Sequence, residues 1–147
     1  MKLYAAYGSN LNTEQMYTRC PGAIPMVGGI LQDYKLVFRR GFLTVEPEKG
    51  QQVQIGIWRI TEYDERRLDL YEGCPNFYRK ETVKVTIGSS EQECLIYIMQ
   101  DGFPIEKPSR GYLKTVLEGY EYFRFDMDPL LDAYNLTTSL TTNSGQI

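Results

Sequence analysis

The chain contains no histidine among its 147 residues. This absence excludes a Ser-His-Asp triad, a Cys-His nucleophile pair and every metal site with histidine ligands. The side chains that remain for proton transfer are those of Asp, Glu, Lys, Tyr and Cys. Any enzymatic interpretation must therefore be built from these residue types.

Cysteine is scarce, and its spacing carries no pattern. Cys20, Cys74 and Cys94 are widely separated and odd in number, so they form neither a CxxC motif nor a disulfide framework. No histidine is available to activate any of them. We interpret all three as structural thiols.

Long apolar runs and a surplus of positive charge are also missing. No apolar run approaches the ~20 residues that a membrane-spanning helix needs, and the first residues lack the apolar segment and cleavage site of a signal peptide. The net charge of −3 argues against binding to nucleic acid, because phosphate recognition needs a basic face. We therefore expect a cytoplasmic protein with neither a nucleic-acid nor a membrane partner. The sequence carries no indication of the oligomeric state.

What is present fits one globular domain, with an apolar content of 42% and a charged content of 24%. We expect residues 1–136 to form this domain and the polar residues 137–147 to form a flexible tail. Several short segments have the composition or the period-two alternation of strands. They are residues 2–7, 23–31, 35–39, 42–45, 53–58, 82–87 and 93–99, the last two forming a hairpin.

Helix signals are sparser. Thr61 and Asp64 form the pattern of a capping box, and Gly73 is a plausible stop for the helix that Thr61 begins. Further helices are predicted over residues 13–19, 109–122 and 129–134. Strands joined mostly by hairpins, with helices inserted, predict an α+β fold whose small mixed sheet is curled or barrel-like.

A possible ligand loop follows the first predicted strand, in the sequence Tyr7-Gly8-Ser9-Asn10-Leu11. Backbone N–H groups in such a turn can point into one concavity and bind an anion, and glycine lets a ligand approach the backbone closely. The alternative is a plain turn, with Asn10 or Asn12 capping the next helix.

Glu72 stands at the predicted end of the helix that begins at Thr61. The negative end of the helix dipole and partial burial beside Tyr71 would both raise the pKa of its carboxyl, which suits general acid-base chemistry near neutral pH. The alternative is an ordinary exposed glutamate. Tyrosine is abundant, with 12 in the chain, and Tyr78, Tyr112 and Tyr120 can either line a pocket or fill the core.

Taken together, these segments resemble the γ-glutamylcyclotransferase family, including its AIG2-like members. The resemblance spans roughly residues 1–134, with its motifs in the expected order. They are the Tyr7 to Leu11 loop, Arg19 to Ala23, Gly56 to Thr61, Leu68 to Gly73 with Tyr78-Arg79, and Pro108-Ser109 with Tyr112-Leu113 and Gly119-Tyr120.

The resemblance implies a small mixed barrel with flanking helices and a cofactor-independent, lyase-like cyclisation. In this reaction a γ-glutamyl amide, such as a γ-glutamyl amino acid or dipeptide, becomes 5-oxoproline plus a free amine, and no metal is used. Carried over by motif, Glu72 is the catalytic acid-base residue. The implied substrate-binding residues are Tyr7, Gly8, Ser9, Asn10, Leu11 and Tyr112.

One segment departs from the family pattern. The sequence after Phe38 is Arg39-Arg40-Gly41-Phe42, where family members often carry a more neutral segment. Either arginine can pair with a substrate carboxylate or lie exposed on the surface. Two alternatives therefore stay open: the same chemistry on γ-glutamyl amines, and a small-molecule-binding module of the same fold that performs no chemistry.

Overall fold

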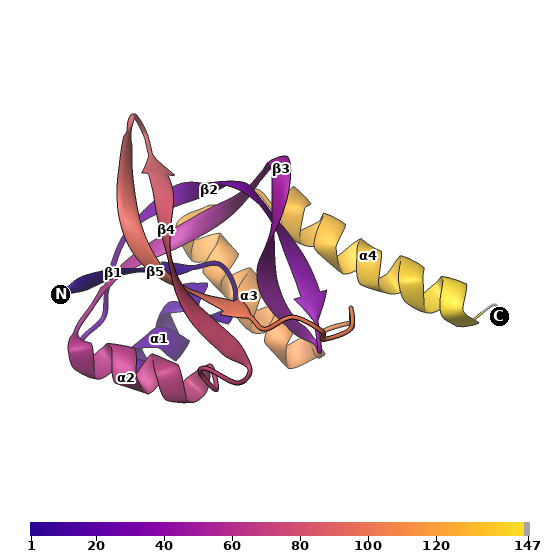
Figure 1. Ribbon diagram of the computed structural model, residues 1–147, viewed down its shortest axis with the longest axis horizontal. Helices are drawn as coiled ribbons and strands as arrows, with labels where there is room; N and C mark the ends of the chain where they lie inside the picture. The colour runs from indigo at the N-terminus through magenta and orange to yellow at the C-terminus, as the bar shows by residue number, and fades with distance from the viewer. Residues whose placement is uncertain (146–147) are drawn as a thin grey trace.

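A computed structural model describes residues 1–145, with side chains through residue 139. Its strands form a closed barrel in the order β1-β3-β2-β4-β5 (Figure 1). Neighbouring strands are antiparallel except β1 and β5, which pair in parallel. The predicted α+β fold with a mixed, barrel-like sheet is confirmed. The strands are β1 (Lys2–Ala6), β2 (Ile24–Arg39), β3 (Phe42–Ile60), β4 (Tyr78–Ile87) and β5 (Ser90–Met99).

Two strands each join segments that the sequence predicts as separate strands, and β4 and β5 begin earlier than predicted. β2 joins the expected segments 23–31 and 35–39, and β3 joins 42–45 and 53–58. The two strands pair along most of their length, with a register shift between Gln32 and Tyr34. Glu46, Pro47 and Gln52 of the polar segment between the two halves of β3 pair with β2, whereas residues 48–51 have no partner there. The segment lacks period-two alternation, so the sequence pattern does not reveal that β3 continues through it.

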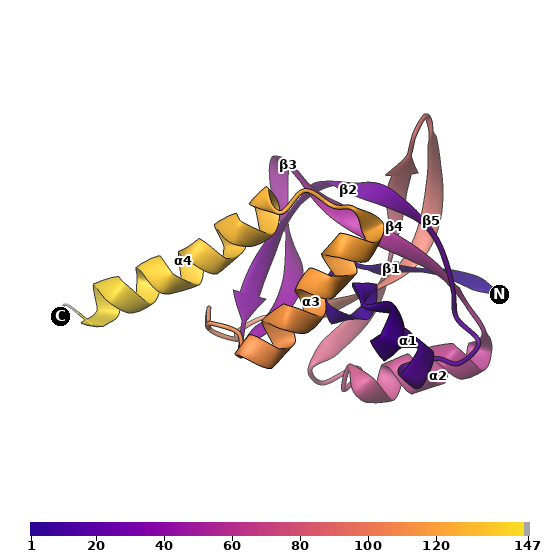
Figure 2. The same cartoon turned by 180° about the vertical axis from the view of Figure 1, so that it is seen from behind.

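The helices begin where the sequence supplies caps. The side chain of Asn12 accepts the N–H of Gln15 at 3.1 Å, and Thr61 and Asp64 form the predicted capping box. Ser109 caps the helix that crosses the barrel in Figure 2. The helices are η1 (Ser9–Leu11), α1 (Thr13–Arg19), α2 (Glu62–Tyr71), α3 (Arg110–Phe123) and α4 (Asp128–Gly145).

Helix α4 packs on β2 through its first turns and then extends away from the barrel (Figure 1). Leu130 and Ala133 are buried, whereas Leu131 is half-exposed. The helix continues past residue 134, where the sequence predicts its end. The sequence predicts a flexible tail over residues 137–147. Residues 137–145 of this segment belong to α4, and residues 146–147 lie outside the described residues. The flexibility of the tail stays a prediction. Within the described residues, no helix combines the length and apolarity that crossing a lipid bilayer requires.

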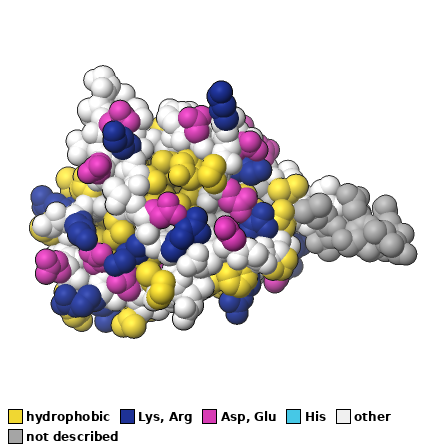
Figure 3. Space-filling view, viewed as in Figure 1, with side chains coloured by type: hydrophobic (Ala, Val, Ile, Leu, Met, Phe, Trp, Pro, Cys, Tyr) yellow, Lys and Arg dark blue, Asp and Glu magenta, His cyan; other side chains and the backbone are white. Residues whose placement is uncertain are grey.

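A close approach between α3 and η1 fixes the turn that follows β1. Leu11 is fully buried, and a Cβ added at Gly119 would lie 2.4 Å from the Cβ of Leu11. Only glycine permits this contact, so α3 holds the turn through its backbone. On the face seen in Figure 3, acidic and basic side chains are interspersed.

Candidate active site

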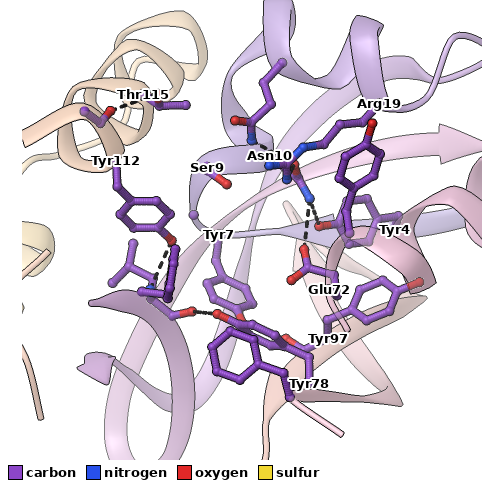
Figure 4. A pocket seen from close by; sticks show the side chains of 17 residues that line it. Tyr4, Tyr7, Ser9, Asn10, Arg19, Glu72, Tyr78, Tyr97, Tyr112 and Thr115 are labelled. Atoms are coloured by element: carbon purple, nitrogen blue, oxygen red, sulfur yellow. Dashed lines mark hydrogen bonds between the residues drawn. The ribbon is translucent and has the colours of Figure 1, made fainter. Parts of the chain in front are cut away.

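A cavity of about 230 Å³ lies where η1, α1, the end of α2 and the start of α3 meet the barrel (Figure 4). Of the seven predicted site residues, all but Leu11 line it. Leu11 is buried in the core, and its N–H donates to the carbonyl of Gly8 at 3.0 Å. Its placement suits a residue that supports the turn. The lining residues include Tyr7, Gly8, Ser9, Asn10, Glu72 and Tyr112.

Glu72 is the C-cap of α2, and its N–H donates to the carbonyl of Leu68 at 2.8 Å. Its half-buried carboxyl faces the cavity, where Oε1 accepts a hydrogen bond of 3.2 Å from Nδ2 of Asn10. Burial raises the pKa of Glu72 to about 7, against the opposing effects of the Arg19 guanidinium and the Asn10 hydrogen bond. The predicted upward shift of this pKa is therefore present, with burial as its main cause.

Asn10 uses all of its side-chain hydrogen-bonding capacity. Its Nδ2 donates to Glu72 and, at 2.9 Å, to the hydroxyl oxygen of Tyr4. Its Oδ1 accepts from Gln15 at 3.1 Å and from Arg19 at 3.0 Å. Because the guanidinium of Arg19 can only donate, the amide oxygen must face it and the NH₂ group must face Glu72. Arg19 thereby sets the orientation of the group that contacts the carboxylate.

Two tyrosine hydroxyl groups have protons free to be donated into the cavity. Tyr4 accepts from Asn10, and Tyr112 accepts the N–H of Leu43 at 3.0 Å. Neither hydroxyl donates to another side chain or carbonyl within the described part of the chain. By contrast, Tyr7 donates to the carbonyl of Tyr97 at 2.5 Å, so its hydroxyl is committed to the protein.

Gly8 and Ser9 of the ligand loop both lie against the hydroxyl of Tyr112. A Cβ at Gly8 would lie 3.1 Å from the Tyr112 hydroxyl oxygen, and the N–H of Ser9 interacts with that hydroxyl. The N–H groups of Leu11 and Asn12 donate within the turn itself. The absence of a side chain at Gly8 thus admits the phenol of Tyr112, and the Ser9 amide polarises that phenol.

The tyrosines of the cavity stay neutral at ordinary pH. Burial, with a smaller contribution from the charge of Glu72, raises the pKa values of Tyr4, Tyr7 and Tyr112 well above the usual range. They can donate hydrogen bonds but cannot act as bases near pH 7. Among the described residues that line the cavity, Glu72 is the one acidic side chain and Arg19 the one basic side chain.

Tyr4, Gln15 and Arg19 also line the cavity, and none of them is among the site residues predicted from the sequence. Gln15 and Arg19 stand one helical turn apart on α1, so they present polar groups on one face. That spacing is a usable signal, since the ligand loop immediately precedes this helix. Tyr120 is fully buried in the core, whereas Tyr78 lines the cavity and donates its hydroxyl to the carbonyl of Leu43 at 2.8 Å.

No group of three or more Cys, Asp or Glu side chains within the described residues is arranged to hold a metal ion. All three cysteines have free thiols, and burial raises the pKa of Cys20 to about 12. A thiol with so high a pKa is a poor nucleophile near neutral pH. Among the described residues that line the cavity, Glu72 is the acidic side chain whose pKa lies near neutral pH.

Comparison with known proteins identifies the family. The profile described as gamma-glutamyl cyclotransferase, AIG2-like, matches residues 4–122. The chain belongs to this family. It is similar to the gamma-glutamylcyclotransferase of Mus musculus, with 32% identity over 130 residues that cover 80% of this chain and 69% of the mouse protein. The human gamma-glutamylcyclotransferase matches with the same identity and coverage.

A solved structure named gamma-glutamyl cyclotransferase superposes on this cyclotransferase-family chain with a TM-score of 0.80 and 28% identity. The match covers 86% of this chain and 82% of that one. The barrel and helices that build the cavity are therefore those of the family.

Proposed function

We propose that the chain is a cyclotransferase that converts a γ-glutamyl amide, such as a γ-glutamyl amino acid or dipeptide, to 5-oxoproline and a free amine. The observation that carries the proposal is Glu72, a carboxyl with a pKa of about 7 that faces the cavity. Such a group can both take and give a proton near neutral pH. The names of the mouse and human relatives support the same reaction.

In the proposed reaction Glu72 first takes a proton from the substrate's α-ammonium group. The freed amine attacks the γ-carbonyl carbon, forming the ring C–N bond and an oxyanion. Glu72 then gives its proton to the departing nitrogen as the amide C–N bond breaks. The ring nitrogen sheds one further proton, and the amine leaves as an ammonium ion. Since the nucleophile is tethered to the carbonyl, the cavity needs only to hold one conformer.

The hydroxyl of Tyr112 is the proposed donor to the oxyanion. Its oxygen accepts the Leu43 N–H and interacts with that of Ser9, which leaves its own proton to donate. The N–H groups of Leu11 and Asn12 are engaged within the turn, and that of Ser9 acts through this phenol. Tyr112 thus takes the place of the direct amide cradle that was one of the two interpretations of the sequence.

The substrate's α-carboxylate is proposed to face Arg19. The α-amino and α-carboxylate groups are bonded to the same carbon, so both must be recognised within a few ångströms of each other. Glu72 and Arg19 contact opposite ends of one amide, that of Asn10, which places an anion and a cation side by side. This arrangement matches the charges of an amino acid head group.

The test is release of 5-oxoproline from γ-glutamyl-alanine, glutathione and ε-(γ-glutamyl)-lysine, each incubated with the purified protein. Release that depends on Glu72 is the expected result. Release from the lysine conjugate alone would indicate γ-glutamyl amines as the substrate class. Binding of these compounds without any release would contradict the enzymatic proposal and favour a binding module.

A further inference from the structure

The two adjacent arginines at the end of β2 have different surroundings. Arg39 pairs with the carboxylate of Glu46 through Nε and Nη2, and its Nη1 donates to the carbonyl of Phe103 at 2.8 Å. Arg40 is exposed, and no carboxylate of a described residue pairs with its guanidinium. Arg39 therefore stabilises the barrel wall, while Arg40 keeps its charge available to a ligand.

The backbone at Arg40 is strained. Arg40 and Gly41 form the two-residue turn between β2 and β3, with φ angles of 53° and 82°. Such turns favour Gly, Asn or Asp at positions of positive φ, because other side chains crowd the backbone. The N–H of Arg40 donates to the carbonyl of Pro104 at 2.9 Å, which anchors the turn. Because a positive φ is unfavourable for arginine, its presence here suggests that the side chain has a role that offsets this cost.

That side chain lies against two aromatic rings, of which that of Phe77 lines the cavity. The guanidinium carbon is 5.0 Å from the ring centroid of Phe77 and 5.5 Å from that of Phe103. Phe77 lines the cavity, as does Phe42, whose ring packs against those of Phe77 and Tyr112. A guanidinium that stacks on a ring keeps its N–H edge free for a carboxylate.

The groove that adjoins the cavity at Arg19 is less suited to an anion. Beyond Arg19 the cavity continues into a groove that Glu14 and Glu118 line. The rings of Tyr112, Phe42 and Phe77 form a continuous series of contacts that ends at Arg40, and none of these residues lines the groove. A carboxylate on the departing amine would be repelled at the groove and attracted at Arg40.

We propose that Arg40 binds a carboxylate carried by the leaving amine, so that the preferred substrates are γ-glutamyl conjugates of α-amino acids. This inference rests on the proposed cyclotransferase function and assigns its two substrate carboxylates to two different arginines. Arg19 holds the carboxylate of the glutamyl group. Arg40 holds that of the amino acid to be released, and conjugates of plain amines lack this contact.

The experiment compares γ-glutamyl-alanine with γ-glutamyl-alaninamide, which differ only in whether the leaving group carries a carboxylate or a carboxamide. We expect the wild type to favour the acid by about tenfold in kcat/KM, the usual scale of a charge-assisted hydrogen bond. In Arg40→Met the ratio falls towards one through a higher KM for the acid, and the amide is turned over as before. Added salt lowers the preference in the wild type only.

Two further variants make the test specific. Arg40→Asn removes the charge and suits the positive φ, so its fold is preserved even if Arg40→Met proves unstable. Arg124→Met is the matched control, because Arg124 is also exposed with a φ of 57° and lies at the end of α3. We expect Arg40→Asn to lose the preference and Arg124→Met to keep it.

The outcomes separate the two proposals. If both substrates are turned over and the Arg40 variants keep the wild-type ratio, the assignment of Arg40 is overturned and the cyclotransferase function stands. If the wild type favours the amide or treats the two alike, the assignment is likewise overturned. If the wild type releases 5-oxoproline from no γ-glutamyl compound, the proposed function fails and the assignment fails with it.

Discussion

Asn10 donates a hydrogen bond of 3.2 Å to Glu72 across 62 residues of sequence, joining the turn after β1 to the end of α2. The same amide accepts a hydrogen bond from Arg19. The carboxylate is thus stabilised by one direct donor and by one nearby cation, and both oppose the effect of burial on its pKa. The pKa of Glu72 therefore depends on burial on one side and on these two contacts on the other.

Replacing Glu72 by Gln is expected to preserve the fold and to lower turnover by about 100- to 10,000-fold, the usual contribution of one acid-base group. Glutamine keeps the size of the side chain and its bond to Asn10, so the loss reports proton transfer. Glu91→Gln, on the exposed β4–β5 hairpin, is the control. Wild-type rates of 5-oxoproline release in purified Glu72→Gln would show that another residue carries the proton.

The rate is expected to depend on pH through the same carboxyl. Glu72 must be ionised to accept the first proton, so kcat/KM should rise with pH and level off above about 7, where the folded-state pKa of Glu72 lies. In Arg19→Met the cation that lowers this pKa is gone, and the acid limb should move to higher pH. Arg19→Lys should restore part of the shift. Profiles that coincide in all three proteins would count against the assignment.

Stability should respond to pH in the opposite sense to activity. The Glu72 pKa is 4.5 in a model compound and about 7 in the folded chain, so the native state binds the proton more tightly. The contribution of Glu72 is fully present below the unfolded pKa and is lost as pH rises through the folded pKa. Relative to wild type, Glu72→Gln should gain up to about 3 kcal/mol across this window. Urea unfolding of both proteins at acidic and alkaline pH measures the gain, and a difference that stays constant with pH would refute it.

Removing the hydroxyl of Tyr112 should slow the chemical step. Tyr112→Phe keeps the ring against Phe42 but loses the proposed donor to the oxyanion, so kcat is expected to fall by about 100-fold. KM should change less, because the oxyanion forms only during the reaction. Tyr122→Phe, at a half-exposed position of the same helix, should leave both constants unchanged. A fall confined to KM would assign Tyr112 to substrate binding.

The contact between α3 and the ligand turn can be tested through two glycines of one helix. Gly119→Ala would force a Cβ to within 2.4 Å of Leu11, and this overpacking should destabilise the fold by about 1–3 kcal/mol. Gly111→Ala adds the same methyl group in open space, so it should be neutral or stabilising by up to about 1 kcal/mol. Equal melting temperatures for the two variants would contradict the close approach.

Local features of the fold were predictable where one short segment determines them. The pair Thr61 and Asp64 specifies the start of α2, and Gly73, with a φ of 60°, follows its end. Helix α1 was predicted with the same bounds because Asn12 caps it. The continuity of β3 through residues 46–52 was missed, because these polar residues show no burial pattern and residues 48–51 have no partner on β2.

The candidate site was predictable from motif order but not from local chemistry. Glu72 and Asn10 belong to separate motifs, and only the closed barrel brings them within hydrogen-bond distance. Tyr4 was missed because a tyrosine in a strand is usually a core residue. Its hydrogen bond with Asn10 depends on the conformation of the turn after β1, which the sequence does not specify. The different roles of Arg39 and Arg40 depend on Glu46, which only the strand pairing brings near Arg39.

The two-residue turn at Arg40 and Gly41 has an evolutionary consequence. It is the tip of a hairpin, so residues inserted there would lengthen a projection without altering the pairing of β2 with β3 or the closure of the barrel. The groups proposed to close the ring lie on other segments and would keep their positions. If Arg40 has the proposed role, changes at this one hairpin tip would alter which leaving amines are accepted without altering the residues of the reaction itself.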